Sequence, residues 1–161
     1  MAHALPFFRS WLITGCLIAA LPAGANDGGM DAKVPLAGAP VDPVYARAMV
    51  EVKAGRYATA IPLLADVIKH DPRNADAFNN LGYSQRKLGQ RDQAMANYAE
   101  ALRLKPEHLG ALEYQGELFL ELGDLSKAET NLNRLATLCG RCESYEDLAQ
   151  AITVYKARPK S

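Results

Sequence analysis

The chain of 161 residues has no excess of charge of either sign, with 18 Lys and Arg against 18 Asp and Glu. A nucleic-acid footprint requires a basic patch or stripe. The sequence also lacks a basic amphipathic segment of the kind that lies on a membrane surface. We therefore expect no nucleic-acid partner and no membrane insertion of the mature chain.

The sequence shows no arrangement of residues that is typical of a catalytic site. No nucleophile is spaced with a base, and no glycine loop would cradle a phosphate. His70 and His108 fall at or just past the ends of expected helices, where we expect solvated loop residues. Glu113, Glu117 and Glu121 could pair carboxylates for acid–base work, but such a row is more commonly a solvated helix face. We expect no enzyme, no cofactor and no metal.

The apolar stretch over residues 11–21 is too short to span a bilayer as a helix, which takes about 20 residues. Arg9 precedes it, and Ala23, Gly24 and Ala25 follow as a small-x-small cleavage site. This arrangement predicts a secretory signal peptide over residues 1–25, cleaved after Ala25, and a periplasmic or secreted protein. An uncleaved membrane anchor is the less favoured alternative.

A second processing site competes with the first. Ile13, Thr14, Gly15 and Cys16 resemble a bacterial lipoprotein box, in which Cys16 would carry a lipid anchor. The residues after Cys16 remain apolar, whereas a mature lipoprotein usually turns polar there. Cleavage after Ala25 is therefore favoured, with a lipoprotein anchored at Cys16 as the alternative.

Residues 26–40 contain several glycines and prolines and no periodic apolar pattern, which predicts a flexible linker. The ordered domain is expected over residues 41–158.

Small and apolar residues recur in that domain with a period of 34 residues. The clearest copy, residues 75–108, has them at Phe78, Leu81, Gly82, Gly89, Ala94, Tyr98, Ala101, Leu102 and Pro106. Spacing of three and four predicts two helices per copy, with a turn at Gly89 and an end before Pro106. Gly82 and Ala94 should lie where the two helices touch.

This pattern resembles the tetratricopeptide repeat family in period and signature. The resemblance covers residues 41–142 as three repeats, 41–74, 75–108 and 109–142, and implies an all-α fold, a right-handed α-solenoid of three helical hairpins. A further helix over residues 143–157 is expected to cap the third repeat. Repeats of this kind make a binding surface rather than a catalytic pocket.

In this family the first helix of each repeat lines a concave groove. The resemblance places there Tyr45, Met49, Val52, Asn79, Asn80, Tyr83, Arg86, Lys87, Glu113, Tyr114, Glu117 and Leu120. Tyrosine and asparagine suit an extended peptide or a helix. The charge is expected to grade from basic near Arg86 and Lys87 to acidic near Glu113 and Glu117.

Some family members grip a C-terminal carboxylate with a cluster of Lys, Arg and Asn. Only Asn80 matches that cluster here, because Tyr45, Met49, Gly110 and Tyr114 fill its other positions. We therefore do not expect binding of chaperone tails by that mode.

Two cysteines, Cys139 and Cys142, remain after signal cleavage. In an exported chain they favour a structural disulfide that pins the last helix to the third repeat. A redox-active pair and half of a zinc site are the alternatives. Covalent haem attachment is disfavoured, since Glu143 stands where that motif requires histidine.

These patterns together predict a non-catalytic protein–protein interaction or scaffold module of the bacterial cell envelope. Its partner would be a protein or peptide held in the concave groove. Two other functions remain open: a thiol–disulfide redox protein that uses Cys139 and Cys142, and a structural subunit of an envelope complex that uses its convex face.

Overall fold

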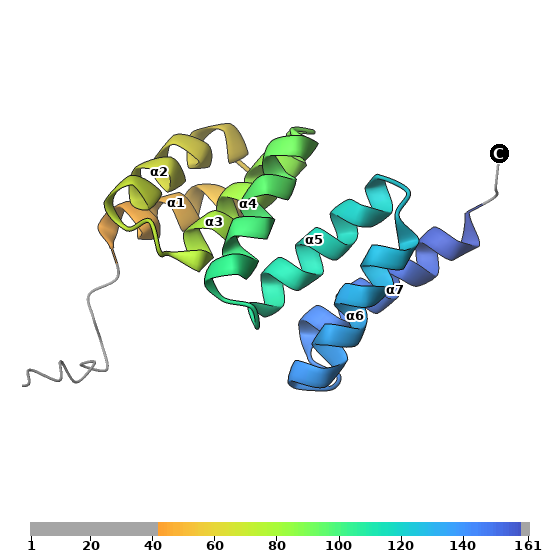
Figure 1. The fold of residues 1–161 in the computed structure, drawn as a ribbon. Coiled ribbons are helices and arrows are strands. Elements are labelled where there is room, and N and C mark those ends of the chain that lie inside the picture. The colour runs from red at the N-terminus through yellow and green to blue at the C-terminus, as the bar shows by residue number, and fades with distance from the viewer. Residues whose placement is uncertain (1–41, 159–161) are drawn as a thin grey trace, which may run out of the picture. The chain divides into compact units, whose positions relative to one another are not determined.

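A computed structural model describes residues 42–158. The predicted signal peptide, the alternative lipid site at Cys16 and the predicted linker lie outside the described residues. Seven helices follow one another as antiparallel neighbours (Figure 1). They are α1 (Pro43–Lys53), α2 (Tyr57–His70), α3 (Ala75–Lys87), α4 (Arg91–Leu104), α5 (Leu109–Glu121), α6 (Leu125–Cys139) and α7 (Glu143–Ala157).

Glycine makes the turn inside each of the first three helix pairs. Gly55, Gly89 and Gly123 have φ values of 70°, 76° and 82°. This left-handed conformation costs glycine little, whereas a Cβ atom would strain it. Because these glycines recur at the repeat period, they fix the same tight turn three times.

Side chains cap the first turns of α1 and α3. Asp42 Oδ1 accepts from Val44 N at 2.7 Å, and Asn74 Oδ1 accepts from Ala77 N at 2.9 Å. Such caps satisfy backbone donors that have no partner within the helix. The register of α1 and α3 is therefore set at their first turns.

The predicted contact between Gly82 and Ala94 is confirmed. A Cβ atom on Gly82 would lie 3.2 Å from the Ala94 carbonyl oxygen and 2.9 Å from the Tyr98 ring, so only glycine lets α3 approach α4 this closely. Tyr98 is fully buried in this contact.

In the third repeat the equivalent glycine, Gly116, faces a different helix. Its Cβ would lie 2.6 Å from Leu148 Cδ2 of α7. Leu148 is fully buried and joins Leu112, Leu135 and Ile152 in one core cluster. Helix α7 therefore packs deeply on α5 as well as on α6.

The two sets of alternating helices differ in their spacing. Helices α1, α3, α5 and α7 each contact the next member of that series, whereas among the described residues α2, α4 and α6 make no contact with one another. The odd-numbered helices thus line the inner face and the even-numbered helices splay apart on the outer face. The predicted helical solenoid is confirmed.

None of the helices in residues 42–158 combines the length and apolar character needed to cross a bilayer.

Candidate binding groove

The structure places the ten predicted groove residues at different depths. Lys87 is exposed; Tyr45, Met49, Asn80, Tyr83, Tyr114 and Glu117 are half-buried; Asn79, Arg86 and Glu113 are buried. Two further residues assigned to the groove, Val52 and Leu120, are also buried. The exposed and half-buried side chains therefore form the accessible surface of the inner face, and the buried ones form a supporting layer beneath it.

Four tyrosine rings run through the first and second repeats into the third. The ring centroids of Tyr83 and Tyr114 are 4.8 Å apart, Tyr57 lies 5.8 Å from Tyr83, and Tyr98 lies 6.4 Å from Tyr114. Tilted and edge-on pairs at these distances are favourable for aromatic rings. Three of the rings are half-buried, so they offer flat apolar area with polar hydroxyl tips.

Arg86 holds the middle of this face together. Its guanidinium lies 5.8 Å from the Tyr83 ring centroid and 6.0 Å from that of Tyr114. It forms an ion pair with Glu117 and donates to Glu121 Oε1 at 2.9 Å, while its own side chain is only 7% exposed. A buried arginine needs such partners, because an unpaired charge there would be strongly destabilising.

The pKa of Arg86 reflects this balance. Burial alone would lower it, but the neighbouring Glu117 and Glu121 carboxylates raise it above the usual arginine value. Arg86 therefore remains charged and tied to α5. The predicted gradient from basic to acidic is wrong at this point, since Arg86 and Glu117 neutralise each other in an ion pair.

Tyr45 and Asn80 join the first and second repeats. Asn80 Nδ2 donates to the Tyr45 hydroxyl at 2.9 Å and to the Asp76 carbonyl oxygen at 2.8 Å. Both amide protons of Asn80 are thereby used within the protein. Asn80 positions Tyr45, and its donors are not free for a peptide backbone.

Glu113 lies under α7 rather than open to the groove. It is 7% exposed. Burial raises the pKa of Glu113 to about 7, the nearby Ser144 hydroxyl opposes this, and the carboxylates of Glu117, Asp147 and Glu143 add to it. A solvated row of carboxylates was expected on α5, and for Glu113 that expectation is wrong because α7 covers it.

A pocket of about 300 Å³ opens between α3, α5 and α7. Its lining comprises Arg86, Glu117, Leu120, Glu121, Ala151, Val154, Tyr155 and Arg158. The three residues from α7 and Arg158, which directly follows this helix, were not predicted to belong to the groove. They follow a spacing of three and four, which puts them on one side of a helix, but so do the buried residues of α7, and sequence alone could not separate the two faces.

His108 is buried, and the prediction that it is a solvated loop residue is wrong. Its Nδ1 accepts from Ala111 N at 3.2 Å and so caps α5, while Nε2 lies 2.9 Å from Asp76 Oδ1. The His108 contact also lowers the pKa of Asp76. His70 is exposed, as predicted. Within residues 42–158 no group of three or more potential metal ligands comes together.

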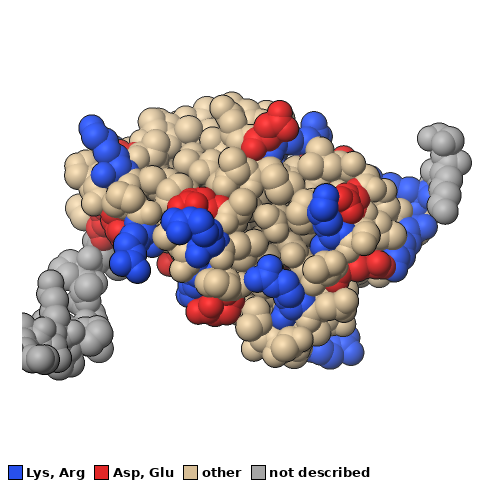
Figure 2. Space-filling view, in the orientation of Figure 1, with Lys and Arg blue, Asp and Glu red and all other residues tan. Residues whose placement is uncertain are grey.

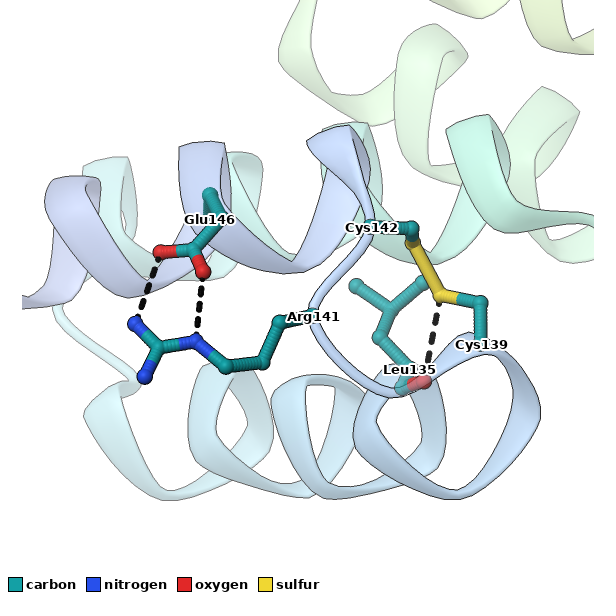
Figure 3. The surroundings of a disulfide bond; sticks show 5 residues. All are labelled: Leu135, Cys139, Arg141, Cys142 and Glu146. Atoms are coloured by element: carbon teal, nitrogen blue, oxygen red, sulfur yellow. Dashed lines mark hydrogen bonds and ion pairs between the residues drawn. A yellow bond between two sulfur atoms is a disulfide. The ribbon is translucent and has the colours of Figure 1, made fainter.

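Cys139 and Cys142 are joined by a disulfide between the end of α6 and the start of α7 (Figure 3). Their Cα atoms lie 5.7 Å apart. Arg141 in the same loop donates from Nε to Glu146 Oε1 of α7 at 2.7 Å. The disulfide and the Arg141–Glu146 ion pair thus both connect this loop to its neighbouring helices.

The charges of the surface are mixed. Figure 2 shows small groups of basic and acidic side chains beside one another, with uncharged surface between the groups. The face of the molecule in that view offers no broad field of one sign that would steer a strongly charged ligand.

Stacked antiparallel helix pairs with one inner face define a helical repeat protein that binds other proteins. Models of the tetratricopeptide repeat match residues 45–89 and 75–108. The chain belongs to the tetratricopeptide repeat family, whose fold serves as a protein-interaction module. The predicted family is confirmed.

Solved structures share this fold. The type III secretion translocator chaperone SycD of Yersinia enterocolitica matches with a TM-score of 0.63 and 20% identity, over 70% of this chain and 81% of SycD. PcrH in complex with the chaperone-binding region of PopD matches with a TM-score of 0.61 and 25% identity, over 71% of this chain and 86% of PcrH. The first tetratricopeptide repeat domain of RPAP3, bound to an HSP90 peptide, matches with a TM-score of 0.64 and 19% identity. The match covers 71% of this chain and 91% of the RPAP3 domain.

A sequence relative is the cellulose synthase 2 operon protein C of Komagataeibacter xylinus. It is 32% identical over 101 residues, which is 63% of this chain. The chain spans only 8% of the length of that relative.

Proposed function

We propose that the chain binds a peptide or an extended segment of a partner protein along the inner face formed by α1, α3, α5 and α7. The observation that carries this proposal is the row of half-buried tyrosines braced by Arg86. A rigid aromatic surface binds at a low entropic cost, because few rotamers must be fixed.

Structural neighbours support the class of ligand. SycD has been solved with a peptide of the translocator YopD, PcrH with the chaperone-binding region of PopD, and the RPAP3 domain with an HSP90 peptide. The HSP90-type carboxylate grip is not proposed here. Asn80, the one matching residue, has both amide protons engaged within the protein.

We also propose that the protein works in the bacterial cell envelope as a scaffold. The predicted signal peptide and the match to a bacterial cellulose synthase operon protein support this location. Mass spectrometry of the processed protein tests it. A chain that begins at Asn26 is expected, whereas a lipid on Cys16 would show the alternative anchor.

The test of groove binding compares two tagged variants in a crosslinking pull-down from cells that make the full chain. Tyr83→Ala with Lys87→Glu alters the inner face. Leu138→Ala with Lys69→Glu makes the same kind of change on α6 and α2, where both side chains are exposed.

The first variant should lose partner proteins that the unaltered chain captures, while the second retains them. Circular dichroism must show that both remain helical. Loss of capture only in the second variant would instead support a structural subunit that uses its outer face.

A further inference from the structure

The apolar face of α7 extends beyond the core. Leu148 and Ile152 are buried against α5 and α6. Ala151 and Tyr155 are partly buried against the same core, and with Val154 they line the pocket between α3, α5 and α7. The contact between Gly116 and Leu148 draws α7 close to α5, which brings this part of the apolar face to the edge of the inner face. The last helix therefore builds a wall of the groove and does more than cap the third repeat.

The pocket combines an apolar wall with a partly open acidic rim. Val154 is 47% exposed, so its apolar side chain is open to a ligand. Leu120 forms part of the buried floor. Across from Val154, the side chains of Glu117 and Glu121 are 26% and 33% exposed, even though both pair with the buried Arg86.

Glu117 has hydrogen-bonding capacity left. Its Oε2 pairs with Arg86, while Oε1 has no hydrogen-bond partner among residues 42–158. The second Glu121 oxygen, by contrast, accepts from Arg91 at 3.1 Å. A carboxylate oxygen can accept further hydrogen bonds, so Glu117 Oε1 can accept one from a donor on the ligand.

The unpaired oxygen of Glu117 favours a cation as that donor. The pocket lining holds two acidic groups, Glu117 and Glu121, and two basic groups, Arg86 and Arg158. Arg86 is buried between the two glutamates, so its charge is already paired. An anionic ligand would be repelled by the remaining Glu117 oxygen, whereas a lysine or arginine would pair with it.

We propose that this pocket takes one large apolar side chain of the partner segment, with a lysine or arginine close beside it in the partner sequence that bonds Glu117. The proposal rests on the proposed groove function and names a specificity site within it. A volume of about 300 Å³ is at the low end for small-molecule sites and suits one side chain with its adjacent backbone. Arg86 lines the pocket and touches the Tyr83 and Tyr114 rings, so the pocket continues the aromatic row.

The test is a selection of random 15-residue peptides displayed on phage against the purified full chain. Selected peptides are then made synthetically, and their binding is measured by fluorescence anisotropy. We expect peptides that share one large apolar residue with Lys or Arg within about three positions.

Two variants examine the pocket directly. Ala151→Leu fills it and should weaken binding of the selected peptides at least about tenfold, as loss of a buried anchor does. Ala136→Leu, an equal change at an exposed site on α6, should leave binding unchanged. Glu117→Gln should lower the preference for Lys or Arg while the apolar preference remains.

The outcomes separate the two proposals. Selected peptides whose binding is lost in Tyr83→Ala with Lys87→Glu but unaffected by Ala151→Leu would overturn the pocket and leave the groove function standing. Selection of apolar residues flanked by Asp or Glu would also overturn the pocket proposal. If the unaltered chain selects no peptide, the groove function fails and the pocket with it.

Discussion

Single residues on the inner face act mainly by fixing other residues. Arg86 braces two tyrosines and two glutamates, Asn80 positions Tyr45, and His108 closes the first turn of α5. A groove fixed in this way loses less freedom when a ligand binds. Substitutions at these positions should therefore alter stability together with binding.

Replacing Arg86 tests this bracing. Arg86→Met should lower the free energy of unfolding by about 2–3 kcal/mol. A fully buried pair costs about 3–5 kcal/mol to break, and the partly exposed carboxylates here can regain water. Arg103→Met is the matched control, because its exposed pair with Glu100 contributes little to stability. Equal losses in urea denaturation would contradict the assigned role.

Glu113 should make the protein less stable as the pH rises. Its pKa is raised by burial to about 7 in the folded state, against 4.5 for a free glutamate. Between these values the folded state binds more protons than the unfolded state, so stability falls with increasing pH. The loss, on the order of 2–3 kcal/mol, should be complete a little above pH 7.

Denaturation midpoints of the unaltered chain and Glu113→Gln, measured from pH 5 to pH 8, give the test. Above pH 7, Glu113→Gln should be more stable than the unaltered chain, and its midpoint should depend much less on pH. Glu107→Gln, a change at an exposed residue, should keep the pH dependence of the unaltered chain. A Glu113→Gln curve parallel to that of the unaltered chain would rule out the assigned titration.

At the level of helices, the approach of α7 to α5 depends on Gly116. Gly116→Ala should destabilise the protein by about 1–2 kcal/mol, since overpacking against Leu148 outweighs the gain in helix propensity. Gly110→Ala, in the same helix, meets only ordinary contacts at 3.5 Å and should be neutral or slightly stabilising. Leu148→Ala should make the Gly116→Ala change harmless in a double-mutant cycle.

The disulfide between α6 and α7 should be structural. The closed loop is very short, so its loss in Cys139→Ser with Cys142→Ser should cost about 2 kcal/mol or less in the chain-entropy description. Urea denaturation measures the cost. A reduction potential below about −300 mV is expected, and a value near −120 to −200 mV would favour the thiol–disulfide redox protein.

For the whole molecule, the repeat period was enough to predict six helices and their pairing, and the helix over residues 143–157 was expected separately. The same small residues recur wherever two helices must approach closely, as Gly82 and Ala94 do. The period did not predict the Arg86 network, the burial of Glu113 and Gly116 by α7, or the burial of His108. The Arg86 network joins side chains 31 and 35 residues apart, and its existence depends on the rotation of α3 and α5 about their axes.

The end of the stack was the hardest part to predict. Glu113 and Gly116 occupy ordinary repeat positions, yet both are covered by a helix that carries no repeat signature. His108 follows the expected end of a helix, so the sequence indicates a loop residue. Only the structure shows that it is buried, in contact with Asp76 and the start of α5. What covers the last repeat is set by tertiary packing, not by the period.

The central claim is that the inner face holds the partner, and a map of photo-crosslinks in living cells tests it most directly. A photoreactive phenylalanine analogue would replace, one at a time, Tyr83, Lys87 and Val154 on the inner face and Ala99, Thr137 and Lys69 on the outer helices. We predict partner crosslinks from the first three sites and none from the others. Crosslinks confined to the outer helices would contradict the account.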